Sequence, residues 1–210
     1  MRRIDAAMAK RKSKVEDFAT DTRSRILEAA RNLLLKRSGG EVSMAEIAKA
    51  AGVSRQAVYL HFSDRGSLFV AMVEHADERR GLRGAIDTIR NAPSGIAALR
   101  AMAAAQSRTN PDVWPLARAS EAIRRTEEAM EKAWKNRLQD RHSRCKAIVK
   151  RLAKEGTLRE GLPIDVATDL LWTITSIHTW EDLALEREWK RSEYEQYISN
   201  VLLRVLTSNS

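Results

Sequence analysis

The chain has 210 residues, with 37 Lys or Arg against 28 Asp or Glu, a formal net charge of +9 and one cysteine, Cys145. A single cysteine excludes an internal disulfide framework and fits a reducing compartment. No apolar run approaches the roughly 20 residues of a membrane span, and the charged N-terminus lacks the core of a secretory signal, so we expect a cytoplasmic protein. Few aromatic residues, Pro or Gly and no strand-like alternation predict an all-helical fold.

The positive charge gathers near the N-terminus. Residues 1–65 hold 14 Lys or Arg against 8 Asp or Glu, whereas residues 66–210 hold 23 against 20. This distribution is consistent with a polyanionic partner that binds the N-terminal part. Residues 1–19 form a basic extension, either a solvated tail or an arm that adds phosphate or minor-groove contacts to DNA.

Thr22 opens the first predicted helix, which runs to about Arg37 and ends at Ser38–Gly39–Gly40. Apolar residues recur on one of its faces at helical spacing. These residues are Ile26, Ala29, Ala30, Leu33 and Leu34.

Residues 43–62 predict two short helices joined by a tight turn, the layout of a helix-turn-helix. Ser43 and Glu46 have the spacing of a capping box. Gly52 stands where the chain must leave the first helix, a position that favours positive φ. Ser54 caps the second helix, and a further cap is expected at Asp64 for a fourth helix.

The second helix of this motif has two different faces. Val58 and Phe62 are four residues apart and are expected to point inward. Arg55, Gln56, Tyr59 and His61 remain outward, so this helix is predicted to read DNA. Tyr59 could instead be a partial core aromatic, and His61 a cap or packing residue.

Three spaced segments, TRxxILxAA from Thr22, AEIAKAAGVS from Ala45 and YxHFxD from Tyr59, resemble the N-terminal domain of the tetracycline-repressor (TetR) family of bacterial transcriptional regulators. One departure is that the family commonly places Lys and an acidic residue after the position of Asp64, where this chain has Arg65 and Gly66. The resemblance implies a helix-turn-helix DNA-binding domain over residues 20–80 and a helical effector-binding and dimerisation domain over residues 81–210.

The candidate DNA contacts follow from the motif and the resemblance. Arg55 and Gln56 lie in the first turn of the reading helix, where Arg suits guanine and Gln suits adenine. Ala57 is small enough to allow close approach to a thymine methyl. Tyr59 and His61 are similar to phosphate-binding positions of the family. The complete set is Thr22, Ser43, Ser54, Arg55, Gln56, Ala57, Tyr59, His61 and Arg65.

Five helical segments are expected in the second domain: Ile96–Arg108, Asp112–Arg124, Glu127–Glu155, Val166–Arg187 and Glu193–Leu206. Ser192 and Glu195 have capping-box spacing for the last of them. The final two segments carry apolar residues around most of their circumference, which predicts a homodimer joined by a four-helix bundle. The alternative is that they complete the core of one protomer.

In the resembled family, helices of the second domain enclose a small inducer. The positions here that resemble the lining of that cavity are Met102, Trp114, Met130, Trp134, Trp172 and His178. They favour a hydrophobic ligand, although Trp and Met on an apolar stripe also serve as core residues. Cys145 and His178 have no partners at metal-ligand spacing, so neither a metal nor a cofactor is expected.

Motifs of hydrolases, metalloproteases, nucleotide-binding loops and dinucleotide sites are lacking in the sequence, so an enzyme is not expected. The sequence predicts a DNA-binding regulator, most simply a repressor released from a palindromic operator by a small inducer. An architectural DNA-binding protein without an effector is the alternative.

Overall fold

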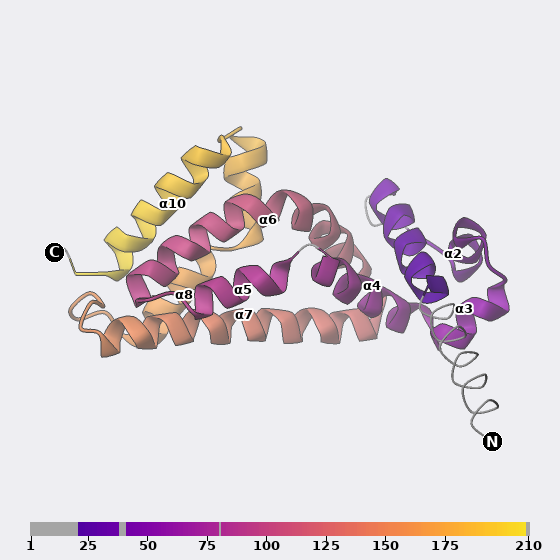
Figure 1. Ribbon diagram of the computed structural model, residues 1–210, viewed down its shortest axis with the longest axis horizontal. Helices are drawn as coiled ribbons and strands as arrows, with labels where there is room; N and C mark the ends of the chain where they lie inside the picture. The colour runs from indigo at the N-terminus through magenta and orange to yellow at the C-terminus, as the bar shows by residue number, and fades with distance from the viewer. Residues whose placement is uncertain (1–20, 38–40, 80, 209–210) are drawn as a thin grey trace, which may run out of the picture. The chain divides into compact units, whose positions relative to one another are not determined.

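The computed structural model describes residues 21–37, 41–79 and 81–208, and Figure 1 shows helices connected by short turns. The described residues contain no strand, only an isolated bridge between Leu158 and Thr207. The predicted all-helical fold is confirmed. Within these ranges, none of the helices combines the length and apolarity needed to cross a membrane. The basic extension of residues 1–19 lies outside the described residues.

The chain divides into two compact units. Unit 1 contains the described residues up to Ala76 together with Arg118–Glu131, and unit 2 contains Asp77–Ala117 and Lys132–Ser210. Residues 118–131 therefore pack with the N-terminal residues although they are distant in sequence. Three helices, α4, α6 and α7, contribute residues to both units.

Unit 1 begins with helical residues 21–36. Helix α2 (Met44–Ala51), helix α3 (Arg55–His61) and most of helix α4 (Arg65–Arg79) follow. The core of the unit is formed by side chains that project from these helices at helical spacing and are almost completely buried. They include Ile26, Leu27, Ala30, Leu34, Ile47, Val58, Leu68, Phe69 and Met72.

Unit 2 contains most of the remaining helices: α5 (Leu82–Arg90), α6 (Gly95–Ile123), α7 (Glu128–Lys154), α8 (Ile164–Ile174), α9 (Ile177–Trp180), the π-helical segment η1 (Glu181–Glu186) and α10 (Arg191–Leu206). Helix α10 packs against α8 and η1. The core includes Leu99, Ala103, Cys145, Val149, Leu152, Leu171, Tyr194, Ile198 and Leu202.

Helix α6 is continuous, so the predicted break at Thr109–Pro111 is wrong. Pro111 lies inside the helix although it lacks the N–H that a helix interior needs. Buried residues lie on both sides of it, Ala103 before and Leu116 after. Burial on both sides of the proline outweighs its local preference to end the helix.

The predicted helix Val166–Arg187 is in fact divided into α8, α9 and η1. The Thr175 hydroxyl donates to the Leu171 carbonyl, 2.6 Å away, and Ser176 takes an extended conformation and caps α9. Arg141 of α7 donates to the carbonyls of Trp172 and Thr175 at 2.7 and 3.0 Å. These bonds satisfy carbonyls at the end of α8 that a continuous helix would have paired.

The predicted capping box of Ser192 and Glu195 is also wrong. Helix α10 begins earlier, at Arg191, with Lys190 as its N-cap residue. The Lys190 N–H donates to Glu193 Oε2 at 2.7 Å. Glu195 is thereby left for a different contact, to Ser107 of α6.

Candidate nucleic-acid interface

Helix α2 is fixed at its start by a network of polar contacts. The predicted capping box is confirmed: the Glu46 N–H donates to Ser43 Oγ, and the Ser43 N–H donates to Glu46 Oε2 at 2.9 Å. Arg37 adds an ion pair to Glu46 at 2.6 Å. The Arg37 hydrogen bond, followed by the bonds from Ser43, lowers the pKa of the Glu46 carboxyl to about 2.

The turn between α2 and α3 has the predicted backbone. Gly52 has φ of 65° and ends α2 in the left-handed conformation. Arg25, from helical residues 21–36, donates to the Ala51 carbonyl at 2.6 Å. A Cβ on Gly52 would lie 3.1 Å from Arg25 Nη2, so this glycine provides both the positive φ and the room for the guanidinium.

Helix α3 has the predicted inner and outer faces. Ser54 Oγ accepts from the Ala57 N–H at 3.1 Å and caps the helix. Val58 and Phe62 are buried and hold the helix against the rest of unit 1, as the sequence predicted. The outer face is free to meet a ligand because its side chains take no part in the core.

The structure places the predicted DNA contacts at the surface to different degrees. The exposed ones are Ser43, Ser54, Arg55, Gln56 and Tyr59, and the half-buried ones are Thr22, Ala57, His61 and Arg65. The interpretation of Tyr59 as a core aromatic is wrong, since its ring is exposed and lies 5.7 Å from the Arg55 guanidinium. The role of His61, whose ring centroid lies 6.3 Å from that of Phe62, stays a prediction.

Leu60 is a surface residue outside the set of predicted DNA contacts. Its side chain is 81% exposed, on the same outer face as Gln56 four residues earlier. Its spacing from Gln56 would have identified it, because an apolar residue one turn beyond a polar reading residue shares its stripe.

Arg65 begins α4 and is held by acidic residues of unit 1. Its Nε donates to Glu127 Oε1 at 2.6 Å, and its Nη1 lies 3.6 Å from Glu41 Oε1. Glu127 is mostly buried, and Glu41 is largely exposed. Glu127 could not be predicted from the sequence, because no local pattern connects residue 127 with residue 65.

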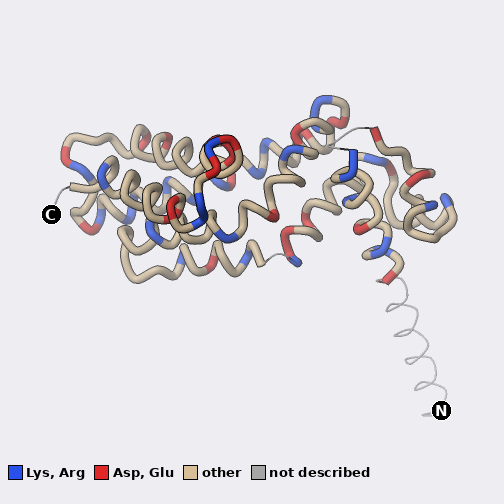
Figure 2. Tube along the Cα trace, turned by 90° about the horizontal axis from the view of Figure 1, so that it is seen from above, with Lys and Arg blue, Asp and Glu red and all other residues tan. Residues whose placement is uncertain are grey.

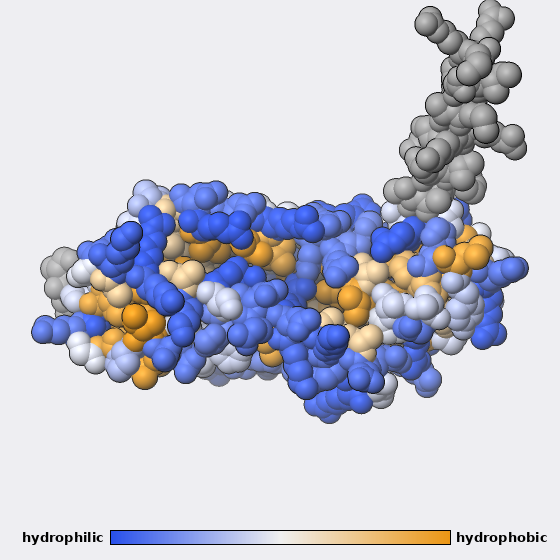
Figure 3. All heavy atoms as spheres, turned by 90° about the horizontal axis from the view of Figure 1, so that it is seen from below, coloured by the Kyte–Doolittle hydropathy of each residue, from blue (hydrophilic) through white to orange (hydrophobic). Residues whose placement is uncertain are grey.

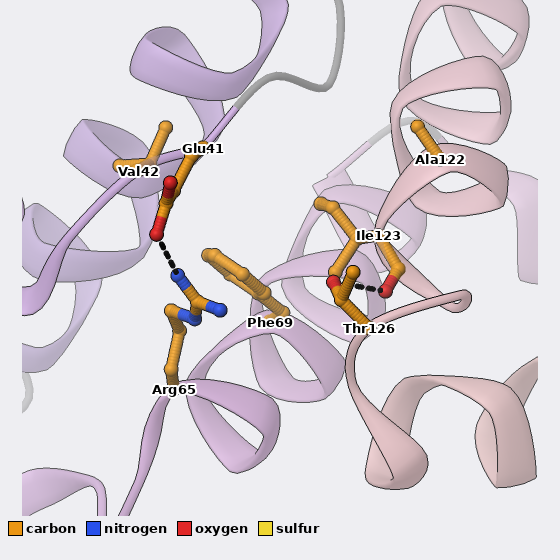
Figure 4. A pocket seen from close by; sticks show the side chains of 7 residues that line it. All are labelled: Glu41, Val42, Arg65, Phe69, Ala122, Ile123 and Thr126. Atoms are coloured by element: carbon orange, nitrogen blue, oxygen red, sulfur yellow. Dashed lines mark hydrogen bonds and ion pairs between the residues drawn. The ribbon is translucent and has the colours of Figure 1, made fainter.

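A cavity of about 270 Å³ lies beside Arg65 within unit 1. Figure 4 shows the Glu41 carboxylate directed at the Arg65 guanidinium, and the Thr126 hydroxyl bonded to the Ile123 carbonyl. The lining residues are Glu41, Val42, Arg65, Phe69, Ala122, Ile123 and Thr126. The cavity therefore adjoins the start of α4.

Gly66 explains the departure from the family pattern after Asp64. Gly66 is buried, and a Cβ there would lie 3.0 Å from the Ala129 Cβ at the start of α7. Asp64 still caps α4, because its Oδ1 accepts from the Ser67 N–H at 2.7 Å. The glycine thus permits a close approach of two helices rather than simply weakening a helix start.

The six residues predicted to line an effector cavity are divided between the units. Met130 is buried in unit 1, and the other five lie in unit 2. Met102 belongs to the core of unit 2, and Trp114 and Trp172 pack against that core. Trp134 is half-buried, and His178 is largely exposed with Nδ1 3.7 Å from Glu181.

Charged residues of both signs are interleaved along the described trace in Figure 2. Over the described part of the chain, no three His, Cys, Asp or Glu side chains are grouped so that they could hold a metal ion. The side chains of α3 are therefore expected to contact a ligand through hydrogen bonds, ion pairs and apolar packing. The fold and this exposed helix define a helix-turn-helix domain of the DNA-binding class.

Comparison with known proteins identifies the family of that domain. Residues 26–72 match the profile described as "Bacterial regulatory proteins, tetR family". The chain is also 42% identical over 71 residues to the HTH-type transcriptional regulator AcrR of Shigella flexneri, a match that covers 34% of this chain and 32% of AcrR. The match spans about a third of that relative's length. Residues 26–72 are therefore similar to the N-terminal DNA-binding domain of the TetR family.

Solved structures extend the likeness of fold to most of the chain. A transcriptional regulator of Saccharomonospora viridis, solved in complex with choline, has a TM-score of 0.71 and 16% identity, covering 90% of this chain and 100% of that one. FadR of Bacillus subtilis, solved in complex with stearoyl-CoA, has a TM-score of 0.69 and 16% identity, covering 87% and 98%. These proteins and AcrR are transcriptional regulators, not enzymes.

Proposed function

We propose that the chain is a sequence-specific transcriptional repressor that leaves a palindromic operator when a small hydrophobic inducer binds. It acts in the cytoplasm on DNA of the nucleoid. The observation that carries this proposal is the outer face of α3, where Arg55, Gln56 and Tyr59 are exposed on a helix fixed by buried Val58 and Phe62.

The chemistry of that face suits the major groove. Arg55 and Gln56 occupy the first turn of α3, the end that meets base edges when a helix-turn-helix docks. Arg can donate two hydrogen bonds to guanine and Gln can pair with adenine, each contributing roughly 1–3 kcal/mol of discrimination. Tyr59 and Ser43 supply hydroxyl groups for phosphates.

A homodimer supplies the two-fold symmetry that a palindrome needs. On α10, Tyr197 and Val201 are exposed one turn apart, and on α8 Val166 is also exposed. Because α8 packs against α10, these side chains belong to a pair of neighbouring helices. Figure 3 shows that apolar surface interrupts the hydrophilic surface on the face in view. A second copy of the pair would complete a four-helix bundle.

Inducer control requires a connection between the two units. Helices α4, α6 and α7 each contribute residues to both, so a change in unit 2 reaches unit 1 through continuous backbone. An inducer shifts the population towards the state that it binds more tightly, by no more than its differential affinity. Support comes from the regulators of similar fold that were solved with choline and with stearoyl-CoA.

Selection of duplexes from a random DNA pool by the purified full chain tests the proposal. We expect one palindromic sequence, retained in the presence of excess competitor DNA at moderate salt. Uniform coating of all duplexes would instead favour the architectural alternative and overturn the repressor. Release of the selected duplex in a screen of hydrophobic small molecules would then identify the inducer.

The dimer is tested separately by the molar mass in solution. Val201→Glu places a charge on the apolar stripe of α10 and is expected to yield a monomer. Gln196→Glu introduces a charge on an exposed position of the same helix and is the matched control. A dimer that persists in Val201→Glu would place the two-fold contact elsewhere.

A further inference from the structure

One face of α6 carries polar groups into the interior of unit 2. Ser107, Asn110 and Trp114 are spaced by three and four residues, so they follow one stripe of the helix. Ser107 and Asn110 are buried, and Trp114 packs partly buried against the core. A stripe in this position would ordinarily be apolar.

Two groups of this stripe have unused hydrogen-bonding capacity. Asn110 is 7% exposed, and its buried Nδ2 has no hydrogen-bond partner within the described part of the chain. The buried Trp114 Nε1 also has none there. Native proteins pair nearly all such groups, so two adjacent unpaired donors require an explanation.

The backbone of the same stretch adds acceptors. Pro111 and Pro115 have no N–H, so the carbonyls of Ser107 and Pro111 cannot receive the usual helix bond from the residue four positions later. Donors of side chains and acceptors of the backbone therefore occur within two turns of α6.

A carboxylate from α10 stands beside this stripe. Glu195 Oε2 accepts from Ser107 Oγ at 2.9 Å, and Glu195 is half-buried. Among the described residues it has no Lys, Arg or His partner. Asn110 follows Ser107 by three residues on α6, so the amide and the carboxylate are neighbours of the same hydroxyl. Together they present a negative charge next to a hydrogen-bond donor.

We propose that Asn110, Trp114 and Glu195 form the binding site of a small organic cation that also carries a hydrogen-bond acceptor. The Glu195 carboxylate binds the cationic group, the Asn110 amide donates to the acceptor, and the Trp114 indole contacts the apolar body of the ligand. The inference rests on the proposed function, since it names the chemical class of the inducer.

The first experiment compares two amides of α6 by thermal unfolding without ligand. Asn110→Leu removes the unpaired Nδ2 donor from a buried position and is expected to raise the Tm by roughly 2–4 °C. Gln106→Leu is the matched control, because Gln106 donates to the Thr175 carbonyl and accepts from the Tyr194 hydroxyl. That variant is expected to lower the Tm. A lower Tm in both variants would mean that the Asn110 side chain stabilises the fold, and this would overturn the proposal.

The second experiment measures binding of three probes of similar size to the full chain by tryptophan fluorescence. The probe 4-methoxybenzylamine, whose ether oxygen is the acceptor, is expected to bind at least 10-fold more tightly than 4-methoxybenzyl alcohol or 4-methoxybenzoate. Glu195→Gln should weaken 4-methoxybenzylamine at least 10-fold, while Glu186→Gln, at an exposed carboxylate of η1, should leave its binding unchanged. Equal binding of the three probes, no 4-methoxybenzylamine binding, or unchanged binding in Glu195→Gln would overturn the site.

Both experiments are performed without DNA, so their failure is separate from failure of the proposed function. Binding of 4-methoxybenzylamine without any preferred duplex would refute the repressor and support the site. A preferred duplex together with equal binding of the three probes would support the repressor and refute the site.

Discussion

Arg65 and Glu127 are joined by a hydrogen bond of 2.6 Å from Nε to Oε1, although 62 residues separate them in sequence. Arg65 begins α4, and Glu127 precedes the first residue of α7, both within unit 1. The guanidinium that was predicted to contact DNA phosphate is therefore already bound by a carboxylate. Any phosphate contact by Arg65 competes with Glu127 or shares its donors.

Removal of the Glu127 charge is expected to strengthen DNA binding. In Glu127→Gln the Arg65 guanidinium loses its closest anion and becomes available to phosphate. We expect higher affinity for all duplexes and a steeper dependence on salt, measured by fluorescence anisotropy over a salt series. Glu128→Gln removes the same charge from an exposed neighbour and is the control. If both variants changed DNA affinity equally, the effect would come from net charge and not from the release of Arg65.

Arg55 and Arg65 are expected to contribute to DNA binding in different ways. Arg55→Ala removes a candidate base contact, so preference at one base position of the selected duplex should relax by roughly 1–3 kcal/mol with little change in the salt slope. Arg65→Ala removes a candidate phosphate contact, so all sequences should weaken about equally and the slope should decrease by about 1. Indistinguishable variants would contradict this division between base reading and positioning.

Leu60 is expected to contact a thymine methyl group. Its exposed side chain cannot bond a phosphate, and it lies one turn beyond Gln56 on the outer face of α3. Replacement of single thymines by uracil in the selected duplex should weaken the wild type at one position and leave Leu60→Ala unaffected there. Stability should change by less than about 0.5 kcal/mol, because the side chain makes little core contact. A uracil effect that persists in Leu60→Ala would assign the contact to another residue.

Local signals in the sequence predicted the helix-turn-helix well. Ser43, Glu46, Gly52 and Ser54 each act on backbone within a few residues, so their roles follow from spacing alone. At Pro111 the local signal predicted a helix end that does not occur, because the burial of α6 in unit 2 overrides the preference of proline.

Contacts between distant residues could not be predicted from one sequence. The bonds of Arg65 to Glu127 and of Ser107 to Glu195 join helices whose pairing no periodicity specifies. For the same reason Glu195 was interpreted as part of a cap, whereas the cap is formed two residues earlier by Glu193.

Gly66 is expected to be intolerant of a side chain. The Cβ of Gly66→Ala would lie 3.0 Å from that of Ala129, so the contact between α4 and α7 must widen, and we expect a loss of about 1–2 kcal/mol in urea unfolding. Gly84→Ala in α5 is the matched control, because no atom lies within 4 Å of its added Cβ. That variant should gain about 0.5–1 kcal/mol from helix propensity. A similar gain at Gly66 would contradict the close approach.

The contribution of Glu46 to stability is expected to disappear in acid. Its pKa of about 2 in the folded chain lies below its ordinary value of 4.5, because Arg37 and Ser43 bind the charged carboxylate. A lowered pKa stabilises the folded state above the unfolded pKa, and this stabilisation is lost as the pH falls from about 4.5 towards 2. Glu46→Ala should therefore be less stable than the wild type at pH 7, with a smaller difference at pH 3, in urea unfolding at each pH. The control is Glu160→Ala, at an exposed carboxylate that has no ion pair among the described residues. If the stability difference between Glu46→Ala and the wild type stayed constant with pH, packing rather than charge would be responsible.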